Sequence, residues 1–171
     1  MAFSSDPADL RGVSPNPSGQ MTLHEALRRH AFARGLGEEQ IATLASMASE
    51  VTFSEGEVIL EDGQHSEAFF LLLTGSVSVE LCAANFIVSV QALGSGQVFG
   101  WSALLDHHDT VFQVRARENT TALRLEGEDL KAACQADPLL GKEVLQRALA
   151  VVAGRVRATE IRFAEMCGIR V

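Results

Sequence analysis

The chain has 171 residues, of which 47% are hydrophobic and 21% charged, a length and apolar content that suit one domain with a single core. Its formal net charge of −8 repels polyanions, so we expect no direct binding to DNA or RNA. No run of about eighteen apolar residues is present, so the sequence supports no membrane span. The cysteines Cys82, Cys134 and Cys167 lack metal-ligand or CxxC spacing, which favours a reduced, cytoplasmic setting.

The first residues differ in composition from the rest. They hold three of the four prolines and many small polar residues, and they lack the charged start and apolar run of a secretory signal. We therefore predict a flexible arm over residues 1–21 and one folded domain over residues 22–171. Deleting the arm is expected to leave the melting temperature nearly unchanged.

Two helices are predicted at the start of the domain. Ala26, Leu27 and His30 recur at the spacing of one helical face, and Ile41 and Leu44 do so in the next segment. Glycines separate the two segments, and the helical period ends near Val51.

Residues 52–126 show the two-residue period of β-strands. Residues 76–81 alternate strictly between polar and apolar, and Phe86, Val88 and Val90 share one face. Glycines stand between the apolar runs, where tight turns favour them, at positions 56, 63, 75, 94, 96 and 100. The fold class is therefore α+β and mainly β, an antiparallel β-roll or jelly-roll of about eight short strands.

The helical period returns after Leu125. A short helix is predicted to stop near Pro138, and a helix of almost thirty residues follows. A narrow apolar seam runs along this long helix, and it is formed by Leu145, Leu149, Val152 and Val156. The seam predicts a homodimer through the long C-terminal helix, although it could instead pack on the chain's own roll along its first half.

Three segments carry a family resemblance. They read F-x-E-G-E-V-I-L at residues 53–60, E-D-G-Q-H-S-E-A-F-F-L-L-L-T-G-S-V-S-V at 61–79, and G-x-G-Q-V-F-G-W-S-A-L-L at 94–105. In pattern and order, residues 27–160 resemble the cyclic-nucleotide-binding domains of CRP/FNR regulators and of kinase regulatory subunits. The resemblance implies that the terminal helix is a dimerisation helix. The end of the chain at Val171 leaves no room for the helix-turn-helix of the regulators, so direct control of transcription is not expected.

The resemblance also implies a phosphate-binding cassette, a short helix from Phe99 to Leu105. In the family this segment reads F-G-E-[apolar]-A-L-L and is followed after four residues by Arg; Glu accepts from the ribose hydroxyl and Arg binds the phosphate. Here Trp101 replaces Glu, and Thr110, followed by Val111, stands where Arg is expected. Trp only donates and Thr carries no charge, so cyclic AMP is not expected to bind in the usual mode. Candidate ligand-binding residues in the cassette are Phe99, Gly100, Trp101, Ser102 and Ala103.

Two interpretations of the altered cassette stay open. Trp101 is either a stacking surface for a different, less charged ligand or a side chain that fills a vacated pocket. Arg155 lies near the place where the family's long helix approaches the ligand. It either supplies the missing charge from another direction or extends to water.

The remaining constellations predict no catalysis. The run from Asp106 to Asp109 holds metal-capable groups, but adjacent residues rarely converge on one ion, so no metal or cofactor is expected. His65 lacks the His-x-His pairing of a cupin enzyme, and no nucleophile with a base partner can be assembled. The sequence therefore predicts a non-enzymatic regulatory domain that senses a small ligand. The alternative is a ligand-free module for protein interaction or dimerisation.

Overall fold

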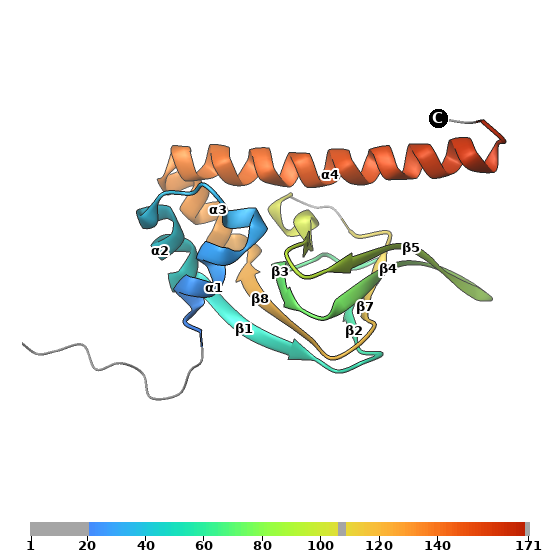
Figure 1. The fold of residues 1–171 in the computed structure, drawn as a ribbon, viewed down its shortest axis with the longest axis horizontal. Coiled ribbons are helices and arrows are strands. Elements are labelled where there is room, and N and C mark those ends of the chain that lie inside the picture. The colour runs from blue at the N-terminus through green and yellow to red at the C-terminus, as the bar shows by residue number, and fades with distance from the viewer. Residues whose placement is uncertain (1–20, 106–108, 170–171) are drawn as a thin grey trace, which may run out of the picture.

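The computed structural model describes residues 21–105 and 109–169, so the predicted arm lies outside the described residues except for Met21. Two sheets form a roll, three helical segments precede it, and a long helix crosses it (Figure 1). The elements are α1 (Leu23–Arg29), the 3-10 helix η1 (Ala31–Ala33), α2 (Glu38–Met47), β1 (Ala48–Phe53), β2 (Val58–Leu60), β3 (Ala68–Thr74), β4 (Ser76–Ala83), β5 (Phe86–Gly94), β6 (Val98–Phe99), η2 (Trp101–Leu104), β7 (Gln113–Ala116), β8 (Thr120–Glu126), α3 (Gly127–Ala136) and α4 (Pro138–Met166).

The strands form two four-stranded sheets, with the orders β1-β8-β3-β6 and β2-β7-β4-β5. All six strand pairs are antiparallel. This arrangement confirms the α+β class and the predicted antiparallel roll of about eight strands. No helix in the described part of the chain is long and apolar enough to cross a membrane.

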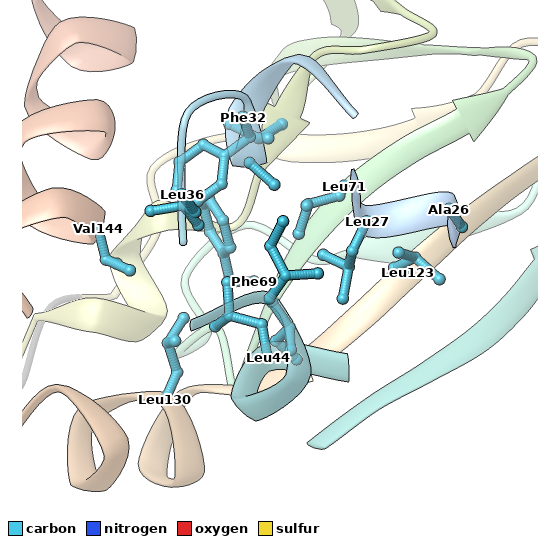
Figure 2. Packing of buried hydrophobic residues seen from close by; sticks show 14 of the residues in the cluster. Ala26, Leu27, Phe32, Leu36, Leu44, Phe69, Leu71, Leu123, Leu130 and Val144 are labelled. Carbon is cyan, nitrogen blue, oxygen red and sulfur yellow. The ribbon is translucent and has the colours of Figure 1, made fainter. Parts of the chain in front are cut away.

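Strand β3 lies between two apolar clusters, which explains why its sequence is apolar without alternation. Phe69 and Leu71 face the helices, whereas Phe70 and Leu72 face the opposite sheet. Figure 2 shows Phe69 among side chains from α2, α3 and α4. A strand covered on both faces needs apolar residues at every position.

The two N-terminal helices form as predicted, and they cover one sheet with Ala26, Leu27 and His30 buried. Both ring nitrogens of His30 are used, because Nδ1 accepts from the backbone N–H of Phe32 and Nε2 lies 3.1 Å from the carbonyl oxygen of Leu72. With Nδ1 as the acceptor, Nε2 is the donor of the neutral ring. Burial lowers the pKa of His30, and the bond to Leu72 opposes that shift only in part.

Helix α4 is built in two parts. Asp137 caps its start, accepting from the backbone N–H groups of Leu139 and Leu140, and Pro138 opens the helix rather than only ending α3. The first part buries Leu140 and Val144 in the helical cluster. The second part continues across the roll (Figure 1).

Two close backbone approaches join this region. A Cβ at Gly141 would lie 2.7 Å from the carbonyl oxygen of Cys134 on α3. At the start of α3, a Cβ at Gly127 would lie 2.6 Å from the carbonyl oxygen of Ala103 on η2. Only glycine allows both contacts, since real Cβ atoms do not approach so closely.

The interpretation of β4 and β5 as alternating, half-buried strands is wrong at their far end. A register shift between Val79 and Glu80 changes the alternation, so that Leu81 is exposed and Glu80 is buried. Phe86 and Val88 are also exposed, because the β4–β5 hairpin extends beyond the roll (Figure 1). No opposing sheet covers it there.

Glu80 is buried by a polar network that the pattern did not predict. It accepts hydrogen bonds from Ser78 at 2.6 Å, Gln113 at 2.8 Å and Arg115 at 3.2 Å. Burial by itself raises the pKa of Glu80, but these bonds and the charge of Arg115 outweigh it and hold the pKa below its usual range. The network therefore keeps a charged carboxylate inside the second sheet.

Candidate functional site: a groove between the roll and helix α4

The predicted cassette helix is shorter than the sequence suggested. Phe99 belongs to β6, where it pairs with Phe70 of β3, and only Trp101–Leu104 form a 3-10 turn, η2. Gly100 joins them with a φ of 76°, and a Cβ there would lie 2.3 Å from the carbonyl oxygen of Ala68. This left-handed glycine ends the strand, so a helix cannot begin at Phe99.

A groove of about 1060 Å³ lies beside η2, with α4 as one wall and β4, β5 and β6 contributing the other. It brings together most of the residues that the sequence analysis selected. Phe99, Gly100, Trp101, Ser102, Thr110, Val111, Val152, Arg155 and Val156 all line it. Ala103 does not, because it is 1% exposed and packs behind the turn in contact distance of Gly127.

Trp101 stands half-buried at the edge of the helical cluster and forms part of the groove wall. The groove remains open beside it. Trp101 therefore borders both the helical cluster and the groove.

Thr110 has its hydrogen-bonding groups engaged within its own turn. Its hydroxyl donates to the carbonyl of Phe112 and accepts from the same residue's N–H, and its backbone pairs with Gly63 and Gln64. Val111 beside it is exposed. This segment supplies no positive charge to the groove.

Arg155 supplies a charge from the opposite wall. Its Nη2 donates to the carbonyl oxygen of Val98 on β6 at 2.6 Å, and burial lowers the pKa of its guanidinium. Two turns further along α4, Arg162 donates to the carbonyl of Val90 on β5. The two arginines thus connect α4 to two strands of the roll.

Other ionisable groups lie at the exposed part of the groove. Asp109 and Glu160 line it, as does Arg162, and all three are exposed. Asp106, His107 and His108 lie outside the described residues. Among residues 21–105 and 109–169, no group of three His, Cys, Asp or Glu side chains is placed to hold a metal ion.

Sequence reasoning missed the walls from β4 and β5 and the end of α4, where Val79, Val90, Ala92 and Phe163 line the groove. One feature of the sequence could have indicated part of these walls. No charged residue occurs between Glu80 and Asp106, a long interval for a mainly exposed hairpin, and an uncharged surface often marks a binding site.

The part of the chain that forms most of the roll and the short turn after β6 matches a known family model. The model is described as "Cyclic nucleotide-binding domain" and matches residues 50–137, which include all of the strands except the first two residues of β1. The chain belongs to the cyclic nucleotide-binding domain family. This family is one of binding domains rather than of catalysts.

The chain is also similar to proteins of several different descriptions. A protein described as a potassium channel in Rhodopseudomonas palustris is 27% identical over 129 residues, which are 75% of this chain and 30% of that protein. The chain thus spans less than a third of that relative. The crystal structure of a protein described as cyclic nucleotide-binding, from Geobacter metallireducens, has a TM-score of 0.71 at 25% identity and covers 80% of this chain and 99% of its own.

A third relative is the regulatory subunit of a cAMP-independent protein kinase A from Trypanosoma brucei. The solved form is a variant bound to cAMP in its A site, with one glutamate changed to alanine, one threonine to arginine and the adjacent valine to alanine. It has a TM-score of 0.65 at 21% identity and covers 85% of this chain and 50% of that chain. The likeness shows that the fold is shared.

Proposed function

We propose that this cyclic nucleotide-binding domain is a regulatory domain that senses a small ligand other than cyclic AMP. One observation carries the proposal: an open groove of about 1060 Å³ lies at the cassette, whereas the cassette itself has Trp101 and Thr110 in place of the family's Glu and Arg. The size suits a small ligand, since such sites usually measure about 300–1000 Å³.

Weak binding of cyclic AMP follows from the missing partners. Each charge-assisted hydrogen bond contributes about 1.5–3 kcal/mol, and two such partners are absent. A loss of about 3–6 kcal/mol weakens binding by roughly two to four powers of ten. Thr110 cannot compensate, because its hydroxyl is already bonded to Phe112.

The relative from Trypanosoma brucei suggests how to test this point. Its cAMP-bound variant carries arginine and alanine in place of an adjacent threonine and valine, and Thr110 and Val111 form the same residue pair here. We therefore expect that Thr110→Arg with Val111→Ala, combined with Trp101→Glu, recovers part of the affinity for cyclic AMP.

Calorimetry on the unaltered chain and on this triple variant measures the effect. The unaltered chain should bind cyclic AMP no better than weakly, and the variant should bind at least about tenfold more tightly. The matched control is Trp101→Glu alone, which restores no phosphate partner and should not produce this gain in affinity for cyclic AMP. Micromolar binding of cyclic AMP by the unaltered chain would contradict the proposal.

The structure also suggests how ligand binding would reach the rest of the molecule. Val152, Arg155 and Val156 of α4 line the groove, so a ligand would contact the helix directly. Leu145 and Leu149 on the adjoining face are exposed, and we infer that they pair with a second copy as a homodimer. Binding in the groove would then shift the position of a helix that both sites share.

A second candidate is a ligand-free interaction module. The exposed apolar side chains of α4 and of the β4–β5 hairpin favour it, since large exposed apolar patches mark interaction surfaces. A thermal-shift screen of metabolites and nucleotides separates the two candidates. A ligand specific for the folded state raises the melting temperature by mass action, and a complete absence of shifts would favour the ligand-free module.

A further inference from the structure

The most unusual group in the groove is the guanidinium of Arg155. It is half-buried, and among the described residues it donates one hydrogen bond, to the carbonyl oxygen of Val98, which leaves most of its five N–H donors available. Within the described part of the chain no carboxylate pairs with it, although five other basic side chains do form such pairs. Burying a cation without an anion is costly.

The surroundings of Arg155 are mostly apolar. Phe99 and Trp101 line the groove on the roll side, and Val152 and Val156 line it on α4 together with Arg155. The other charged groups, Asp109, Glu160 and Arg162, are exposed. Among the described residues, the interior of the groove therefore offers one cation and an extended apolar surface.

We propose that the groove binds an amphipathic monoanion, an apolar chain or ring system bearing one carboxylate, and that the carboxylate pairs with Arg155. The proposal rests on the groove being a ligand site, as proposed above, and adds the chemical class of the ligand. A planar guanidinium matches a carboxylate with two parallel hydrogen bonds. A dianionic phosphate fits less well, because Asp109 and Glu160 repel a second negative charge and the described residues that line the groove include no second half-buried cation.

In a phosphate-binding cassette the roll holds the anion, whereas here the anion would be held on the opposite side of the groove. The charge comes from α4, so the anion would be bound by the helix rather than by the roll. Arg155 already connects α4 to β6 through Val98, and a bound carboxylate would share the guanidinium with that carbonyl. Ligand binding would thus act on the contact between helix and roll.

The test compares decanoate with decanol, which share the apolar chain and differ in charge, both below their micellar concentrations. Trp101 is the only tryptophan and the chain has no tyrosine, so its emission reports on the groove. Calorimetry supplies the affinities. We expect decanoate to bind about ten- to hundredfold more tightly than decanol, and decyl phosphate to bind more weakly than decanoate.

Variants assign the difference to one side chain. Arg155→Met should weaken decanoate binding to the level of decanol and leave decanol binding unchanged, whereas Arg155→Lys should retain part of the preference. The control is Arg157→Gln, which removes an exposed arginine of α4 that does not line the groove. It should change neither affinity. Melting temperatures of all variants check that α4 stays docked.

The outcomes separate the two proposals. Equal affinities for decanoate and decanol, or a preference that survives Arg155→Met, would overturn the role of Arg155 while the response of Trp101 still supported a ligand site. If neither compound changed the emission, the inferred ligand class would be wrong. The metabolite screen described above would then decide whether the groove binds any ligand.

Discussion

Replacing Leu149 by glutamate should dissociate the proposed homodimer without unfolding the chain. Leu149 is 67% exposed in the single chain, so the change costs little within one molecule. Fully burying a leucine side chain contributes about 1.5–3 kcal/mol, and a two-fold interface contains the residue twice. Scaled by that exposed fraction, the free energy of dimerisation lost from both copies is about 2–4 kcal/mol, which raises the dimer Kd roughly thirty- to thousandfold.

Sedimentation equilibrium of the unaltered chain and of Leu149→Glu measures this change, and urea unfolding monitors the fold. Ala150→Glu is the matched control, because it adds the same charge at an exposed neighbouring position that lies about 100° around the helix. It should leave the dimer intact. An unaltered chain that sediments as a monomer, or a Leu149→Glu chain that dimerises as before, would show that α4 is not the interface.

Three further predictions concern the fold that supports the groove. Gly100→Ala should lower the free energy of unfolding in urea by at least about 1–3 kcal/mol, because it combines a left-handed φ with a Cβ 2.3 Å from the carbonyl oxygen of Ala68. A loss near zero would mean that the turn can rearrange. Since burial sets the pKa of His30 below its ordinary value of 6.5, the unfolded state binds the proton more tightly and stability should fall as the pH drops below about 6.5. In His30→Gln that part of the pH dependence should disappear, and an unchanged slope would contradict the assignment. Leu140→Ala should cost about 2–5 kcal/mol, whereas Leu139→Ala, at a position that is 71% exposed, should cost less than about 0.5 kcal/mol; equal losses would show that the two faces of the helix are wrongly assigned.

The periodic signals predicted the elements well where one face meets the core. Ala26, Leu27 and His30 on α1, and Ile41 and Leu44 on α2, are buried as their spacing indicated. Each helix is amphipathic over its own short length, although its buried face packs on distant residues such as Phe69 and Leu71. Such local patterns need no knowledge of the tertiary fold.

Prediction was wrong where the environment depends on distant segments. The alternation in residues 76–81 cannot show that Gln113 and Arg115 from β7 bury Glu80, or that a register shift exposes Leu81. Nor can it show that the hairpin bearing Phe86 leaves the roll. These features depend on strand pairing across tens of residues.

The sequence selected some of the residues that line the groove and missed others. The resemblance placed Trp101, Thr110 and Arg155 near one another, and all three line one groove. The side formed by Val79 and Val90 was not expected, because it depends on how far α4 extends over β4 and β5. The cassette motif marks one short segment, whereas a groove is defined by every element that surrounds it.

The close approaches at Gly127 and Gly141 have a mechanical consequence. At the first, the carbonyl of Ala103 on η2 meets the start of α3, and at the second the carbonyl of Cys134 near the end of α3 meets the start of α4. Neither contact leaves room for a methyl group, so rearrangement of side chains at these contacts cannot absorb a displacement of η2. The turn η2, helix α3 and the first turn of α4 should therefore move together as one rigid body. A small displacement near Trp101 would then be magnified along the 29 residues of α4.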